Sequence, residues 1–179
     1  TTLLSSAASD VYKRQVLIAH GTLPDQAKCE QDAELAAREF KNNSLSVIAL
    51  LSELANRMEA QKSGCIAVIT SVAGDRGRPS NYLYAAAKSA VTEFCSGLRG
   101  RLFRSGVRVL TIKPGFVATP MTQHLALPEL LLATPEKVAK DIVRAVDKRR
   151  SSLYTPWFWR PIMLIIVHIP GFIFKRLSL

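Results

Sequence analysis

Three short apolar runs, separated by long stretches of helical periodicity, constrain the fold of this chain more than any other feature. The apolar runs are residues 16–19 (VLIA), 65–69 (CIAVI) and 107–112 (VRVLTI). The helical patterns are residues 32–61, 81–102 and 134–148. Short buried strands that alternate with long helices predict an α/β fold, in which a parallel sheet carries helices on both faces. Residues 153–155 are expected to add a short edge strand.

The loops that follow the predicted strands carry most of the chemically useful residues. In an open parallel sheet, the ligand site lies beyond the carboxyl ends of the strands. The loops that begin there are His20-Gly21, Thr70-Ser71 and Lys113-Pro114-Gly115. We therefore expect them to meet at one edge of the sheet and to form the functional site.

A tyrosine and a lysine one helical turn apart form the most informative chemical pattern. Tyr84 and Lys88 are four residues apart in a predicted helix, so they project from the same face. A neighbouring ammonium stabilises a phenolate, which predicts that the pKa of Tyr84 lies below its ordinary value of about 10. Such a tyrosine can exchange a proton with a carbonyl or alcohol oxygen, and Ser71 can hydrogen-bond the same oxygen. The alternative is structural, with Tyr84 packed on the sheet and Lys88 a solvated charge.

The composition favours one domain and argues against two classes of function. The chain has 179 residues, of which 48% are hydrophobic, so one sizeable core is expected. The formal net charge is +10, but the basic residues are not interleaved with aromatic ones, which argues against nucleic-acid binding. The three cysteines are odd in number and lack metal-ligand spacing, so we expect reduced thiols and no metal site.

Several motifs occur together in a fixed order. They are a strand that ends in Gly21, a helix that contains Asn43, TSVAG at residues 70–74, YAAAK at residues 84–88 and PGFVAT at residues 114–119. In this combination the sequence resembles the short-chain dehydrogenase/reductase family over nearly all of residues 16–155. The resemblance implies a Rossmann-like doubly wound parallel sheet and an oxidoreductase that interconverts a carbonyl and an alcohol. The implied cofactor is NADP or NAD.

The resemblance assigns catalytic roles to four residues. Tyr84 matches the acid/base that protonates the substrate oxygen during reduction. Lys88 matches the residue that lowers the tyrosine pKa and binds the nicotinamide ribose. Ser71 matches the residue that orients the carbonyl. Asn43 matches the helix asparagine of the proton relay, with Asn42 as the alternative because the spacing to Ser71 varies.

The same resemblance assigns the nicotinamide end of a cofactor site. Its residues are Gly21, Tyr84, Lys88, Pro114, Gly115, Val117 and Thr119. Pro114 and Gly115 match a turn that lets the backbone approach the nicotinamide. Val117 and Thr119 match positions that contact its carboxamide. Residues 18–20 (IAH) replace the Asn-Asn-Ala that precedes the glycine in the family.

The amino-terminal part of the family pattern is not found in this sequence. The family begins with a strand, a TGxxxGxG turn and a helix that together hold the pyrophosphate. Nothing before Val16 matches them, so we expect a sheet without the first three strands of the family. An isolated chain of this kind is expected to bind cofactor poorly and to turn over little. Residues 1–15 (TTLLSSAASDVYKRQ) resemble translated adaptor sequence and are expected to be a non-native tail.

Residues 156–179 form the most apolar segment and are expected to lie apart from the domain of residues 16–155. Arg160 and Pro170-Gly171 interrupt the apolar run, which argues against a spanning helix of about 20 residues. Tryptophans at one end and Lys175-Arg176 at the other favour a peripheral anchor. This anchor would hold a cytoplasmic protein on the inner face of the membrane. The alternative is that the tail packs on its own domain or on a second subunit of a homo-oligomer.

A membrane-lying reductase implies a hydrophobic or lipid-linked substrate. Residues 119–134 contain ALPELLLA, which predicts an apolar substrate pocket. The tail is also similar to that of the decaprenylphosphoryl 2-keto-pentose reductase group. The competing hypothesis is a non-catalytic Rossmann-like scaffold at a membrane surface. The substrate, the direction of the reaction and the choice between NAD and NADP stay open at this point.

Overall fold

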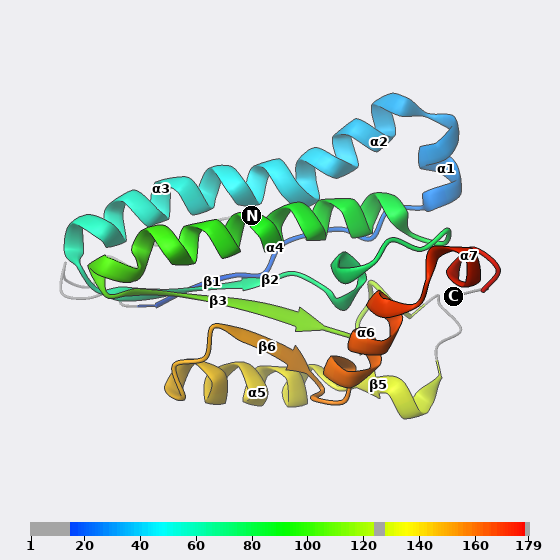
Figure 1. Cartoon of the computed structure of the whole chain (residues 1–179). Coiled ribbons are helices and arrows are strands. Elements are labelled where there is room, and N and C mark those ends of the chain that lie inside the picture. Colours follow the sequence, from blue (N-terminus) through cyan, green and yellow to red (C-terminus); the bar gives the residue numbers. More distant parts are fainter. Residues whose placement is uncertain (1–14, 124–127, 178–179) are drawn as a thin grey trace.

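The computed structural model describes residues 15–123 and 128–177, and within them it has the predicted α/β fold (Figure 1). The main sheet has four parallel strands in the order β1-β2-β3-β6. They are β1 (Gln15–Ile18), β2 (Gly64–Ile69), β3 (Val107–Pro114) and β6 (Ser152–Thr155). β6 is the expected edge strand, and it pairs with the end of β3.

Helices cover the two faces of the sheet unequally (Figure 1). The first face carries the segment α1 (Gln26–Gln31), α2 (Ala33–Phe40), η1 (Lys41–Leu45), α3 (Ser46–Gln61) and, after β2, α4 (Tyr82–Leu102). The other face carries α5 (Pro135–Asp147). The sequence predicts one continuous helix where the structure has α2 and α3 joined by η1, which is a turn of π-helix.

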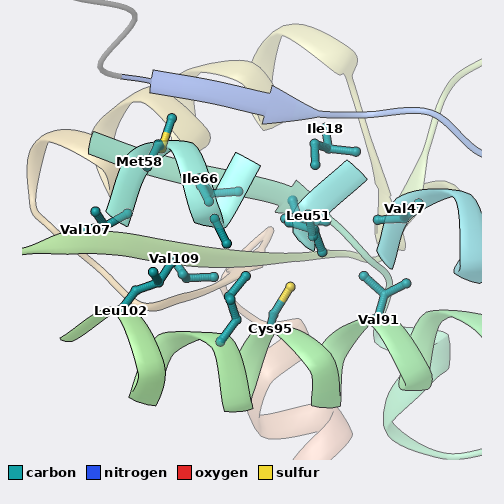
Figure 2. Close-up of a cluster of buried hydrophobic side chains, with 13 residues drawn as sticks. Ile18, Val47, Leu51, Met58, Ile66, Val91, Cys95, Leu102, Val107 and Val109 are labelled. Atoms are coloured by element: carbon teal, nitrogen blue, oxygen red, sulfur yellow. The ribbon is translucent and has the colours of Figure 1, made fainter. Parts of the chain in front are cut away.

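The main core lies between the sheet and the helices α3 and α4 (Figure 2). Leu51 of α3, Cys95 of α4 and Ile66 of β2 are fully buried there. Apolar side chains three and four residues apart on each helix meet the side chains on the facing side of the strands. Cys29, Cys65 and Cys95 are free and buried, which agrees with reduced thiols.

Two predicted boundaries differ from the structure. Gln15, predicted to belong to a non-native tail, is the first residue of β1 and pairs with Cys65. Residues 1–14 of that tail lie outside the described residues. The strand predicted for residues 107–112 extends to Pro114. Proline is tolerated at this strand end because the next residue, Gly115, supplies the N–H that Thr155 O accepts at 3.0 Å.

Five short elements lie in the loops. They are η2 (Val72–Asp75), η3 (Phe103–Ser105), β4 (Phe116–Val117), η4 (Glu129–Leu131) and β5 (Leu132–Ala133). The strands β4 and β5 pair in parallel and form a separate small sheet. The turn η2 directly follows the carboxyl end of β2, so it stands at the edge where the site was expected.

The carboxyl-terminal segment folds as α6 (Trp159–His168) and α7 (Gly171–Phe174). Trp159 and Met163 on its inner side are buried against Val72 of η2. The outer side leaves large apolar residues exposed, namely Leu164, Ile165, Val167, Phe172, Ile173 and Leu177. The segment thus packs on its own domain and also presents an apolar surface. Within the described ranges, no helix has the length and apolar character needed to cross a bilayer.

Arg76 fastens this segment to the loop after β2. Its guanidinium donates hydrogen bonds to the carbonyl oxygens of Ile166 (2.6 Å), Val167 (3.0 Å) and Ile169 (2.6 Å). These carbonyls lie at the end of α6, where helical partners run out. The same guanidinium lies 3.7 Å from the centroid of the Phe174 ring. Arg76 therefore caps α6 and holds α7 beside it.

Candidate active site

Ser71 stands immediately beyond the carboxyl end of β2. Thr70 ties this strand end to β3, because its N–H and its hydroxyl both donate to the carbonyl oxygen of Ile112, at 2.7 and 2.9 Å. Ser71 then caps η2, and its hydroxyl accepts a hydrogen bond from Ala73 N at 3.1 Å. The strand end and the cap together fix the serine at the predicted edge of the sheet.

Gly74 brings the turn η2 against the helix α4. A β-carbon on Gly74 would lie 2.8 Å from the backbone nitrogen of Ser89 and 2.9 Å from the carbonyl carbon of Lys88. The neighbouring atoms belong to a helix backbone, which cannot yield. Glycine at this position lets the Ser71 turn pack directly on the helical turn that contains Lys88.

Tyr84 is partly buried on the first turn of α4, and it lines the same cavity as Ser71. Burial raises the pKa of the Tyr84 phenol, and the neighbouring Ser71 hydroxyl acts in the opposite direction. The prediction that Lys88 lowers this pKa is wrong for the structure. Desolvation outweighs the effect of Ser71, and the Lys88 ammonium lies 5.5 Å from the ring centroid, a cation–π distance.

Lys88 is buried, with only 3% of its surface exposed. Desolvation lowers the pKa of its ammonium to about 8. A β-carbon on Gly21, whose φ is +158°, would lie 2.9 Å from Lys88 Nζ and 2.9 Å from Asn43 Oδ1. Gly21 therefore lets the loop after β1 close over the lysine. Within the described residues, no side chain or carbonyl accepts a hydrogen bond from Lys88 Nζ, so its donors are free for a ligand.

Asn43 lies in the π-helical turn η1 and is buried, with 1% of its surface exposed. Its amide nitrogen donates to Glu39 O at 3.1 Å and to Thr22 Oγ1 at 2.8 Å. Its amide oxygen accepts from Thr22 N at 2.9 Å. Asn42 is exposed and contributes only its carbonyl, which accepts from Ser46 Oγ at 2.7 Å. The structure thus brings Asn43, and not Asn42, to Gly21 and Lys88.

Sequence reasoning missed Thr22 and the π-helical turn. Thr22 follows Gly21 directly and forms hydrogen bonds with both the oxygen and the nitrogen of the Asn43 amide. Its position next to a predicted site glycine was the sequence signal that could have identified it. The extra residue of a π-helix has no periodicity of its own in a short window, although such turns are frequent at functional sites.

A cavity of about 540 Å³ opens at this edge of the sheet. Six of the predicted site residues line it, namely Ser71, Tyr84, Pro114, Gly115, Val117 and Thr119. Gly21, Asn43 and Lys88 form a second cluster, which the Lys88–Tyr84 contact joins to the cavity. Residues 124–127 of the predicted pocket segment lie outside the described residues. Pro120, Met121 and Thr122 of that segment line the cavity.

Packing requires a glycine at position 115, for a reason that the sequence did not reveal. A β-carbon there would lie 1.8 Å from the indole Nε1 of Trp159, so the position admits no side chain while Trp159 is in place. Phe116 meets the same indole edge-on, with ring centroids 5.1 Å apart. The carboxyl-terminal helix α6 therefore supports the wall of the cavity.

Comparison with known proteins agrees with this arrangement of strands and loops. The sequence model of the short chain dehydrogenase family matches residues 2–129. The chain belongs to the short-chain dehydrogenase family. It is 37% identical over 161 residues to an uncharacterised oxidoreductase of Mycobacterium tuberculosis (strain ATCC 25618 / H37Rv). That alignment covers 90% of this chain and 64% of the relative, so the chain spans slightly less than two thirds of the relative's length.

Solved structures share the fold. A short-chain dehydrogenase from Burkholderia cenocepacia J2315, in complex with NADP, superposes with a TM-score of 0.79 at 19% identity, over 92% of this chain and 68% of that one. A short-chain dehydrogenase from Sphingobium yanoikuyae, in complex with NADPH, superposes with a TM-score of 0.72 at 20% identity. The superposition covers 88% of this chain and 66% of that one. At these identities the likeness confirms the Rossmann-like doubly wound fold.

The effect of Ser71 on the pKa of Tyr84 yields a direct prediction. Ser71→Ala should raise the pKa of Tyr84 further, because it removes the hydroxyl that favours the phenolate and leaves burial to act alone. The measurement is a pH titration of the ring-carbon NMR signal in chain labelled with [13Cζ]tyrosine. Ser52→Ala, a serine on α3 away from the site, should leave the titration unchanged. A Tyr84 pKa at or below the ordinary value in the unmodified chain would contradict this account.

Proposed function

We propose that this chain carries the proton-transfer part of an NAD(P)-dependent oxidoreductase that interconverts a carbonyl and an alcohol. The observation that carries the proposal is the pair of hydroxyl residues, Ser71 and Tyr84, which line the wall of one cavity, with Ser71 near enough to oppose the rise in the pKa of Tyr84. A carbonyl oxygen between two such hydroxyls can be held and protonated without a change in the backbone. Family membership supports oxidoreductase chemistry.

Each residue of the two clusters has a distinct task in this proposal. Tyr84 donates its proton to the substrate oxygen during reduction, and a raised pKa keeps the phenol protonated for that step. Ser71 holds the same oxygen by a hydrogen bond and opposes the charge that develops on it. Asn43 fixes the loop at Gly21 and Thr22, so it is proposed as part of the relay that returns a proton to Tyr84.

The residues present fit a nicotinamide dinucleotide at its nicotinamide end. Lys88 offers free ammonium donors beside Tyr84, which suits the hydroxyl groups of a ribose. Pro114, Gly115, Val117 and Thr119 form the adjoining wall. When bound, the nicotinamide supplies or accepts the hydride. Solved neighbours are in complex with NADP, NADPH or NADH, so the proposal covers both NADP and NAD.

We also propose that the isolated chain binds this cofactor poorly and turns over little. The β1 edge supports this proposal, because Leu17 of the strand is 51% exposed although it is apolar. A groove of about 240 Å³ runs between β1 and α5, with Val16, Ala67 and Ile142 among its walls. An apolar sheet edge and groove of this kind suit coverage by further strands and helices of a longer parent.

One assay tests the catalytic proposal and the fragment proposal. The chain alone should show no micromolar binding of NADPH by fluorescence and no reduction of a long-chain ketone above buffer. In the full reading frame of the parent, turnover is expected. Tyr84→Phe should then lower kcat by about 10²–10⁴-fold, because the proton donor is lost. Ser71→Ala should lower it by about 10²–10³-fold.

Tyr82→Phe is the matched control, because this tyrosine lies on the same helix and is 48% exposed. Its turnover should equal that of the unmodified parent. Full activity in Tyr84→Phe would remove the catalytic proposal and favour the non-catalytic scaffold. Tight NADPH binding by the chain alone would remove the fragment proposal.

The outer surface of α6 and α7 supports a proposal of peripheral membrane contact. Leu164, Ile165 and Phe172 are each more than 60% exposed. Arg160 and the exposed Lys175-Arg176 pair flank this surface, which suits an anionic lipid headgroup layer. A reductase seated in this way on the cytoplasmic leaflet would meet a hydrophobic or lipid-linked substrate, and the apolar cavity wall fits such a substrate.

Co-sedimentation with vesicles that contain anionic phospholipid tests the membrane contact. The chain should sediment with the vesicles, and Leu164→Asp/Ile165→Asp should shift most of it to the supernatant, because two carboxylates then face the lipid. Val143→Asp on α5, where valine is 60% exposed, is the control and should sediment like the unmodified chain. Equal soluble fractions for all three proteins would remove the anchor and favour a subunit interface on this surface.

A further inference from the structure

Two buried polar groups in the cavity wall have no use in the proposed proton transfer. Arg78 Nε and Asn81 Oδ1 are shielded from solvent and lack a hydrogen-bond partner among the described residues. Both residues line the cavity that contains Ser71 and Tyr84. Buried polar atoms are nearly always satisfied, and Arg78 Nε is a donor, so its missing partner is an acceptor that a ligand can supply. Asn81 Oδ1 is itself an acceptor and lacks a donor.

The turn that carries these groups is fixed relative to Tyr84. Asn81 N donates to Arg78 O at 3.0 Å, and Asn81 O accepts from Ala85 N at 2.9 Å. The helix α4 begins at the next residue, Tyr82, so Asn81 and Tyr84 belong to one helical start. Arg78 and Asn81 are thereby held in a constant relation to the phenol, as residues that select a substrate must be.

The charge of Arg78 is not compensated within the described residues. Burial lowers the pKa of its guanidinium, and no carboxylate contributes to that shift. The neighbouring Arg76 is different, because three carbonyl oxygens accept its hydrogen bonds. Arg101 also has a partner, in Glu59. An unpaired cation in an apolar wall is costly, and a bound anion removes that cost.

We propose that Arg78 binds an anionic oxygen group, a phosphate or a carboxylate, on an otherwise apolar substrate. The planar guanidinium fork matches both groups, and the apolar surroundings strengthen the contact. The apolar remainder of such a substrate would lie along Val72, Phe116 and Met121, which line the same cavity. This inference rests on the proposed function, because the ligand is a substrate only if the chain is part of such an enzyme. Arg78 is then a specificity-determining residue and not a catalytic one.

Binding of short amphiphiles to the chain tests the inference without turnover. Octyl phosphate, octanoate and octanol are titrated below their micellar concentrations, with the Tyr84 signal of [13Cζ]tyrosine-labelled chain as the readout at the cavity. Octyl phosphate or octanoate should bind at least about tenfold more tightly than octanol, as expected for a charge-assisted hydrogen bond out of water. Arg78→Met should remove this preference and retain octanol binding, which shows that the cavity is intact.

Arg104→Met is the matched control, because it removes the same charge from an exposed position on η3. It should keep the preference for the anion. Equal loss in both variants, or an unchanged preference in Arg78→Met, would overturn the inference. Ser71→Ala separates the two proposals, because it retains the Tyr84 signal and should keep anion binding in the chain while it lowers turnover in the parent. Equal preference for phosphate and carboxylate would support a shared anion site.

Discussion

The site depends on the burial of one ammonium, that of Lys88. Its surroundings are built from small residues and amide groups that leave room for the amine, with the Tyr84 ring on one side. Gly21 closes over Nζ and Gly74 packs on the backbone at the same turn, and neither position has space for a β-carbon. Asn43 holds the loop that contains Gly21 through its hydrogen bonds with Thr22. The loop after β1, the turn after β2, the π-helical turn η1 and the helix α4 thus converge on this amine.

A second set of contacts joins the carboxyl-terminal segment to the same edge of the sheet. The Asp75 carboxylate of η2 accepts a hydrogen bond from Lys113 Nζ at 2.5 Å and from Tyr154 OH at 2.8 Å. This partly buried pair links η2 to the ends of β3 and β6, and burial together with the Asp75 carboxylate raises the pKa of Tyr154. With Trp159 against Gly115, it makes α6 part of the frame of the cavity. The proposed membrane-contact surface therefore lies on an element that supports the site.

The strand segments and the site edge could be predicted because both follow from local patterns. Apolar runs of strand length mark β1, β2 and β3, and loops after parallel strands meet at one edge. What the sequence could not supply depends on burial in three dimensions. The raised pKa of Tyr84 is such a case, because its main cause is the desolvation of the phenol, which depends on the fold. The orphaned Arg78 is another, since an arginine in a Gly- and Pro-rich loop indicates a solvated charge until the cavity around it is seen.

The pH dependence of stability tests the buried ammonium most directly. The folded-state pKa of Lys88 lies at about 8, below its ordinary value of 10.5, so the unfolded chain binds more protons between these values. The free energy of unfolding of the chain, relative to Lys88→Met, should therefore be lowest and constant below about pH 8 and should rise up to about pH 10.5. Urea denaturation across this window measures it, with Lys140→Met as the exposed control. A difference between the chain and Lys88→Met that stays constant across the window would contradict the account.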